Sequence, residues 1–309
     1  GGVAVFFAFF IILFFVRERI LSGSLEAHHW LGVFIGAFFL LIGGVIDDKY
    51  NLQPGRQIIF PVLAALCVVA GGVGIEKVTN PLGGLFFLDQ LKFPVLKYGG
   101  EWHYFVLIAD LFTIIWLLGM MYSTKLLDAI DGLVTGVTGI GAFIIFLFTM
   151  TTKYYQPDIG IASLILAGAC LGFLIFNWHP AKIFLGESGS LLTGFILGVL
   201  AIISGGKIAI ALLIMGIPIM DVAWTIIRRL RAGKNPFKFA DRLHLHHRLL
   251  DSGLGQRKTV LIFYAFSTIF GLSGLFLQSK GKFFALTSLA AIMLAIVAGF
   301  SFVGRKNNI

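Results

Sequence analysis

Two adjacent aspartates, Asp47 and Asp48, end an apolar run that reads "LIGGVIDDKYN" over residues 41–51. Ionisable groups at the ends of apolar helices are costly in lipid and often functional, although an acidic pair solvated at a membrane interface gives the same pattern. A second pair, Asp128 and Asp131 in "KLLDAIDG", would share one face of a helix. A capped helix junction, with Gly132 permitting the turn, is the alternative interpretation of that pair.

A glycine-rich segment, "FLGESGS", lies immediately before another apolar run. Its glycines and small serines allow backbone N–H groups to approach a ligand, and the following helix would direct its N-terminus at the same place. The alternative is a glycine-rich turn in which Ser190 caps the helix.

Three histidines occur together in "HLHH", inside a strongly basic connection. On a helix, His244 and His247 would face one way while His246 would point elsewhere. A three-histidine zinc site lacks companion acids at the HExxH spacing, and a solvated basic connection is the other interpretation.

The composition indicates the elements that must position these groups. The chain has 309 residues, of which 58% are hydrophobic and 13% charged, and its mean hydropathy is +0.94. These values predict an all-α polytopic membrane protein. The net charge of +9 comes from basic residues between apolar segments, which favours membrane topology and anionic lipid over a nucleic acid partner.

Ten apolar runs are long enough to cross, or nearly cross, a bilayer core of about 30 Å. They cover residues 1–16, 31–47, 57–78, 104–123, 133–152, 159–178, 190–205, 207–228, 259–278 and 283–304. The prediction is therefore a single integral-membrane domain over residues 1–309, with a small β-hairpin in "LFFLDQLKFPVLKYGGEW" on the outer side. The chain begins already apolar, so we expect an upstream helix to be missing.

Most basic residues follow even-numbered runs, which places those connections in the cytoplasm. All the clusters described above lie in these same connections, so we expect the chemistry to face the cytoplasm. Carboxylates suit Mg²⁺, which completes its shell with phosphate oxygens and water, and Lys and Arg suit the remaining phosphate charge. The clusters thus predict ion and phosphate binding at the lipid surface.

The motifs resemble those of the polyprenyl-phosphate N-acetylhexosamine-1-phosphate transferases, which include the phospho-MurNAc-pentapeptide translocase of peptidoglycan synthesis. The similarity covers essentially the whole chain, in matching order: "DDKYNL" with Arg56 downstream, "DAIDGLVTG", "FLGESGS" and "HLHHRLLDSGLGQR". The H-x-H-H-R form resembles the branch that uses UDP-N-acetylglucosamine or a similar UDP-sugar. The resemblance implies transfer of a sugar-1-phosphate from a UDP-sugar to a polyprenyl phosphate, with release of UMP, as the first membrane step of cell-envelope glycan synthesis.

The resemblance also implies roles for individual residues. Asp47 and Asp48 match the paired acids that position or deprotonate the acceptor phosphate or, in some proposals, attack as nucleophiles. Glu187 matches the acid that binds Mg²⁺, with Mn²⁺ as the alternative metal. Asp47 is a second candidate metal ligand, and His246 and His247 complete the implied catalytic set. The implied substrate-binding residues are Arg56, Lys125, Asp128, Asp131, Phe184, His244 and Arg248, with Phe184 beside uracil and the histidine motif near the diphosphate and sugar.

Three positions depart from the family pattern. Lys125 stands where the family usually has Asn, Glu187 where it has Asp, and Arg56 where it usually has Lys. Each residue can still contact phosphate or metal, so we expect an active, divergent member.

The resemblance further implies a bacterial or archaeal plasma membrane location and leaves a homodimer open. Two other functions remain alternatives: a lipid or solute transporter, and a transferase of the peptidoglycan type. Transporters tend to have inverted repeats and midplane charges. The spans here contain few charges, chiefly Asp110 and Asp221, which favours an enzyme.

Overall fold

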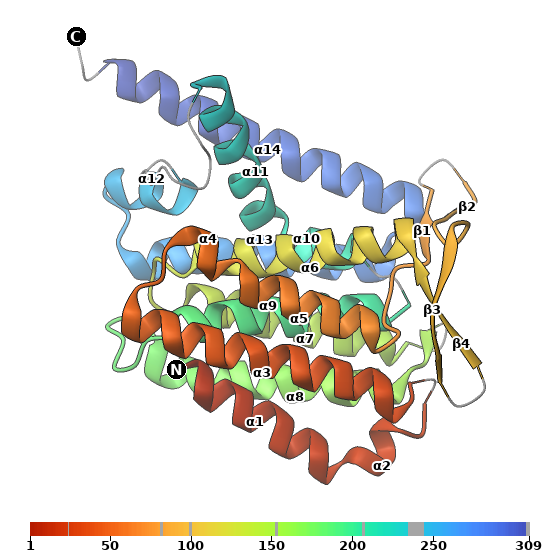
Figure 1. Cartoon of the computed structure of the whole chain (residues 1–309). Helices are drawn as coiled ribbons and strands as arrows, with labels where there is room; N and C mark the ends of the chain where they lie inside the picture. Colours follow the sequence, from red (N-terminus) through yellow and green to blue (C-terminus); the bar gives the residue numbers. More distant parts are fainter. Residues whose placement is uncertain are drawn as a thin grey trace.

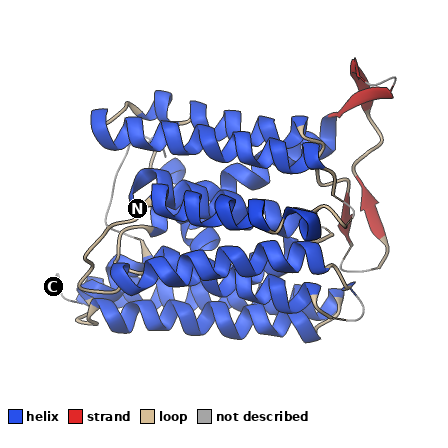
Figure 2. Cartoon of the chain, turned by 90° about the horizontal axis from the view of Figure 1, so that it is seen from below, coloured by secondary structure: helices blue, strands red, loops and turns tan. Residues whose placement is uncertain are grey.

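A bundle of long helices forms the body of the molecule, and four short strands lie at one end of it (Figures 1 and 2). The computed structural model describes residues 1–309 except 24, 81–82, 99–100, 152–153, 206–207, 234–243 and 307–309. The longer helices are α1 (Gly2–Phe15), α3 (Ala27–Tyr50), α5 (Ile59–Ala70), α6 (Leu107–Leu127), α7 (Leu133–Thr149), α8 (Pro157–Asn177), α9 (Gly186–Ile203), α11 (Gly216–Arg231), α13 (Gln256–Phe276) and α14 (Ser279–Lys306). The shorter elements are α2 (Arg17–Ile20), α4 (Pro54–Gln57), α10 (Ile208–Ile214), α12 (Leu245–Asp251), β1 (Lys77–Thr79), β2 (Leu85–Phe87), β3 (Lys92–Tyr98) and β4 (Glu101–Val106).

The helices have the length and composition of a multi-pass membrane protein. In the described part of the chain, six are long and apolar enough to cross a membrane, or seven if the bent pair α10–α11 counts as one span. Three further apolar helices are shorter: Gly2–Phe15, Pro54–Ala70 and Leu133–Thr149. Each of the ten predicted ranges contains a helix, but the count of ten spans stays a prediction.

Two of the predicted ranges differ from the structure. The run 57–78 is helical only as far as Ala70, because the chain turns at Gly72, whose φ is +81°, and continues to strand β1. The run 207–228 is not one straight helix, since α10 and α11 are bent by 81°. Pro218 explains this break, because proline has no N–H and its ring would clash with the carbonyl of Ile214 in a continuous helix.

The predicted hairpin is confirmed in part. Strands β3 and β4 pair antiparallel, with Tyr98 opposite Glu101, and residues 99–100 between them lie outside the described residues. Strand β2, which the prediction placed in the same hairpin, pairs instead with β1. The connection "SGGK" between α9 and α10 also lies partly outside the described residues, which omit 206–207.

Helix α9 is the centre of the bundle, and almost all of its residues are buried. It crosses α3 so closely that a Cβ atom on Gly44 would lie 2.2 Å from the Cα of Ser188. Because Asp48 lies one turn beyond Gly44 and Glu187 precedes Ser188, this crossing brings the two acids together.

The helix directions gather the predicted motifs at one end of the bundle (Figure 1). Helices α3, α6 and α8 finish there and α9 begins there, while the strands lie at the opposite end. We call the first the carboxylate end, for Asp47, Asp48, Asp128, Asp131 and Glu187, and the second the hairpin end.

Candidate active site

Asp47 and Asp48 lie in the last turn of α3, where the chain reverses. Asn51 ends the helix in the left-handed conformation, with φ 49°. The backbone N–H of Leu52 then donates to Oδ1 of Asp47 at 2.7 Å, and Nε2 of Gln57 donates to the same oxygen at 3.1 Å. The carboxylate of Asp47 is therefore held in place by the segment that follows it.

The glycine-rich segment meets the other aspartate. The backbone N–H of Glu187 donates to Oδ1 of Asp48 at 3.1 Å. Gly186 has a φ of +75°, and a Cβ on it would lie 3.0 Å from Oδ2 of Asp48. Glycine at this position thus permits both the left-handed turn and the close approach of backbone to carboxylate.

Lys125, in the last turn of α6, connects the acids of α3 and α9. Its ammonium group forms an ion pair with Oε1 of Glu187 and donates to Oε1 of Gln57 at 3.1 Å. The ammonium also lies 5.7 Å from the ring centre of Tyr122, within cation–π distance. We call Asp47, Asp48, Gln57, Lys125 and Glu187 the carboxylate cluster, because hydrogen bonds and one ion pair join them in a chain.

Asp128 follows α6 directly and adds a further acid beside this cluster. Its pKa is raised to about 7, mainly by burial and in smaller part by the negative charges of Glu187, Asp131 and Asp48. Asp128 can therefore exchange a proton near neutral pH.

Asp131 is fixed by the connection between α8 and α9. Its Oδ2 lies 2.8 Å from Nδ1 of His179 and accepts a hydrogen bond from the backbone N–H of Ala181 at 3.2 Å. The carbonyl of His179 in turn accepts from Nε of Arg257 at 2.9 Å. These contacts hold the connection that leads to the glycine-rich segment.

The histidine cluster, His244, His246 and His247, comes from α12 and the residue before it. His244 caps the helix in an extended conformation, and its Nδ1 lies 2.7 Å from Oδ2 of Asp221 on α11. The rings of His244 and His246 stack 5.6 Å apart, and those of His246 and His247 lie 4.3 Å apart. The prediction that His246 points away from the other two is therefore wrong, because His244 lies outside the helix.

His246 is the most enclosed member of the histidine cluster. It is 1% exposed, and within the described residues neither of its ring nitrogens has a hydrogen-bond partner. Its pKa is lowered to about 4, mainly by burial and in smaller part by the neighbouring His247. The ring is therefore neutral at physiological pH, with one nitrogen able to donate and the other to accept.

The remaining predicted residues, Arg56, Phe184 and Arg248, belong to segments at the same end of the molecule. Arg56 is exposed on α4, where its neighbour Gln57 makes the contact to the acids. Phe184 is 69% exposed just before α9, as a ring available to stack on a base would be. Arg248 lies on α12 and is partly buried.

Three residues with structural roles at the site were not predicted: Gln57, His179 and Asp221. The sequence contained a signal for His179, because this polar residue stands in "WHP" between an apolar run and the glycine-rich segment. Asp221 was noted only as a rare charge within a span. Nothing local distinguishes Gln57 from an ordinary polar residue after a helix.

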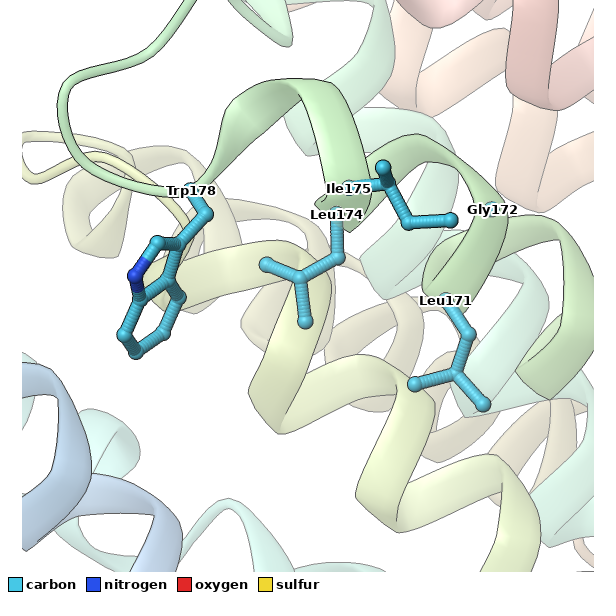
Figure 3. Close-up of a pocket in the computed structure, with 5 residues that line it drawn as sticks. All are labelled: Leu171, Gly172, Leu174, Ile175 and Trp178. Carbon is cyan, nitrogen blue, oxygen red and sulfur yellow. The ribbon is translucent and has the colours of Figure 1, made fainter.

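An apolar hollow lies on α8 beside the site (Figure 3). It is lined by Leu171, Gly172, Leu174, Ile175 and Trp178. Trp178 directly precedes His179, the partner of Asp131, so the hollow reaches the carboxylate end.

The acids have the donor chemistry that Mg²⁺ prefers, since it takes one or two carboxylates and completes its shell with phosphate and water. The hydrogen bonds described above go to Oδ1 of both Asp47 and Asp48, and Gly186 leaves space beside Oδ2 of Asp48. Within the described residues, no group of three or more His, Cys, Asp or Glu side chains has metal-site geometry. The residues therefore fit an open magnesium site shared with a phosphate ligand, and a closed protein-only site is not formed there.

A helical membrane bundle that gathers carboxylates, a lysine and histidines at one end defines the class: a polytopic membrane enzyme for phosphate-bearing substrates. Residues 30–205, more than half of the chain, match glycosyl transferase family 4, and the chain belongs to this family.

Three relatives illustrate the similarity. A "Probable undecaprenyl-phosphate N-acetylglucosaminyl 1-phosphate transferase" of Bacillus subtilis is 30% identical over 90% of this chain and 73% of its own length. A decaprenyl-phosphate N-acetylglucosaminephosphotransferase of Mycobacterium tuberculosis is 29% identical over 97% of this chain and 76% of its own. A phospho-N-acetylmuramoyl-pentapeptide-transferase of Bacillus subtilis is 34% identical over 90% of this chain and 82% of its own.

Proposed function

We propose that this protein transfers N-acetylhexosamine-1-phosphate, with N-acetylglucosamine as the favoured sugar, from a UDP-sugar to a polyprenyl phosphate and releases UMP. The observation that carries the proposal is the carboxylate cluster, in which acids from α3 and α9 and a lysine from α6 meet at one end of an apolar bundle. The names of the relatives support both the phosphosugar chemistry and the lipid acceptor.

The reaction needs counter-charge before any bond changes, because the donor diphosphate and the acceptor phosphate are both anions. A bound Mg²⁺ would supply Lewis-acid stabilisation of the diphosphate and of the UMP leaving group. Glu187 and Asp47 would hold it, and Lys125 and Arg56 would contribute positive charge to the phosphates.

The acceptor phosphate itself is the nucleophile in our proposal. A phosphate monoester is already mostly ionised near neutral pH, because its second pKa is about 6, so a general base is almost superfluous. Asp47 or Asp48 would then position the attacking oxygen for in-line displacement, in preference to forming a covalent aspartyl intermediate. The backbone hydrogen bonds that both carboxylates accept suit a positioning role.

The lipid tail and the membrane orientation follow from the surroundings of the site. The hollow on α8 offers an apolar surface for an isoprenoid chain next to Asp131 and His179. The carboxylate end has most of the basic connections, and the positive-inside rule supports our proposal that this end faces the cytoplasm. The resemblance supports a bacterial or archaeal plasma membrane.

The muramoyl-pentapeptide donor should be compared directly with the UDP-N-acetylhexosamines, because one relative is a phospho-N-acetylmuramoyl-pentapeptide-transferase. We would incubate the purified full chain with undecaprenyl phosphate, Mg²⁺ and a panel of UDP-N-acetylglucosamine, UDP-N-acetylgalactosamine and UDP-N-acetylmuramoyl-pentapeptide, and measure UMP. The expected result is UMP release with an N-acetylhexosamine donor and its loss in EDTA. Release with the muramoyl donor alone would assign the peptidoglycan-type reaction, and no release with any donor would leave a transporter as the better account.

A further inference from the structure

The side chain of Lys125 occupies a position at which a cation belongs. Its ammonium contacts the carboxylate of Glu187, the side-chain carbonyl of Gln57 and the ring face of Tyr122. Gln57 in turn donates to Asp47, so the ammonium is one amide group away from a second acid. The side chains of Lys125 and Glu187 are only 19% and 20% exposed, which leaves little solvent to screen their pairing.

The carboxylates around Lys125 carry more negative charge than its single ammonium group can offset. Asp47 and Asp48 act electrostatically on Glu187, and Asp48 accepts the N–H of Glu187 itself. One ammonium therefore offsets several carboxylates, and a divalent cation placed among them would have to share Glu187 with Lys125. Two cations at a few ångströms repel each other strongly where water is scarce.

We propose that Lys125 is a built-in occupant of the metal site, which pairs with Glu187 in the metal-free protein and must release it before a divalent cation binds. This inference rests on the proposed function only in its choice of cation. It makes Lys125 a positioning residue that sets the metal concentration needed to assemble the site. Gln57 shares this role, because it holds the ammonium by its side-chain carbonyl.

The first test measures metal affinity without any substrate. Mn²⁺ would be titrated into the purified full chain, and free Mn²⁺ would be followed by electron paramagnetic resonance. Because Lys125→Gln removes the competing charge, we expect it to bind Mn²⁺ at least about tenfold more tightly than the unchanged protein. Equal or weaker binding by Lys125→Gln would overturn the proposal.

Lys182→Gln is the matched control. Lys182 is an exposed lysine in the connection between α8 and α9, so this variant loses the same charge at the same end without touching Glu187. Its Mn²⁺ affinity should stay within about twofold of the unchanged protein, as expected for a solvated charge. A gain equal to that of Lys125→Gln would reduce the effect to net charge and would also overturn the proposal.

The second test needs no variant and therefore does not depend on folding of Lys125→Gln. An amine-reactive acetylating reagent would be applied with and without saturating Mg²⁺, and modification of each lysine would be quantified by mass spectrometry. Release of the ammonium predicts that Mg²⁺ raises the reactivity of Lys125 severalfold while that of Lys182 stays constant. Unchanged or reduced reactivity of Lys125 would contradict the release step.

Neither readout requires turnover, so the two proposals fail separately. A protein that releases no UMP from any donor, yet binds Mn²⁺ more tightly as Lys125→Gln, would refute the proposed function and keep the inference about Lys125. An active transferase with unaltered Mn²⁺ affinity in Lys125→Gln would support the proposed function and refute the inference about Lys125.

Discussion

The carboxylate cluster and the histidine cluster lie at the same end of the molecule but differ in how their polar groups are satisfied. In the carboxylate cluster, Asp47, Asp48 and Glu187 all have protein donors, supplied by Leu52, Gln57, Lys125 and the glycine-rich segment. In the histidine cluster, His244 is anchored on Asp221, whereas the ring nitrogens of His246 have no partner among the described residues.

This difference shows two ways in which the fold orders polar groups. The acids are held apart and partly neutralised by donors of the protein itself, so they are ordered before a cation or substrate arrives. The ring of His246 is ordered by stacking between two other imidazoles, and a buried polar group without a partner is costly. A ligand that reached His246 would therefore gain a preformed donor and acceptor.

The largest effect should come from Glu187→Gln, which breaks the carboxylate cluster. The amide keeps the shape but loses the charge that pairs with Lys125, so turnover should fall about 10²- to 10³-fold, as when one electrostatic contact to a transition state is removed. UMP release at varied Mg²⁺ would measure both turnover and the metal requirement. Circular dichroism should show unchanged helix content.

Glu187→Asp provides the graded comparison. The shorter carboxylate keeps the charge, so we expect reduced but measurable turnover with a raised Mg²⁺ requirement. Unaltered Mg²⁺ dependence in Glu187→Gln would remove Glu187 as a ligand and move the metal to Asp47, Asp48 or Asp128.

His246→Phe tests the histidine cluster and has a smaller expected effect. The family resemblance implies a catalytic role for His246, and on that hypothesis its loss should lower UMP release about 10²-fold. The same substitution should change the pH dependence of stability. The native pKa of about 4 lies below the ordinary value of 6.5, so the unfolded chain binds a proton first as pH falls.

The stability that a neutral His246 contributes is therefore present above pH 6.5 and is lost progressively as pH falls toward 4. Thermal unfolding of the unchanged protein at pH 7.5 and 5 should show this loss, and His246→Phe should show less of it. His28→Phe is the control, because His28 is a half-exposed histidine in the first turn of α3, whereas the carboxylate end lies at the last turn of that helix. An equal pH dependence in His246→Phe and the unchanged protein would argue against a buried neutral ring.

The smallest effect is expected from Gln57→Leu, which removes the amide between Asp47 and Lys125. Both charged groups keep their other partners, so turnover should fall only about tenfold, corresponding to one hydrogen bond to a charged group. The exposed neighbour Gln53 provides the control, and Gln53→Leu should keep full activity. Equal UMP release by both variants would show that the hydrogen bonds of Gln57 to Asp47 and Lys125 do not contribute to turnover.

Much of the fold could be predicted because its signals are local. Apolar runs predict helices wherever they occur, and every predicted run contains one. The segment "LFFLDQLKFPVLKYGGEW" predicted a hairpin, and the pairing of β3 with β4 confirms it in part. The ends of helices were less predictable, as at Ala70, because the turn there depends on one glycine conformation rather than on the apolar pattern.

The sequence by itself determined the membrane class, the helix-forming segments and the residue types at the site, because hydropathy and motif spacing are properties of neighbouring residues. Only the tertiary structure decided which side chains meet. The ion pair of Lys125 with Glu187, the hydrogen bond from Glu187 to Asp48 and the contact of His244 with Asp221 all depend on where helices cross and end. The close crossing at Gly44 and Ser188 brings Asp48 to Glu187, and such a contact between distant segments leaves no local pattern in the chain.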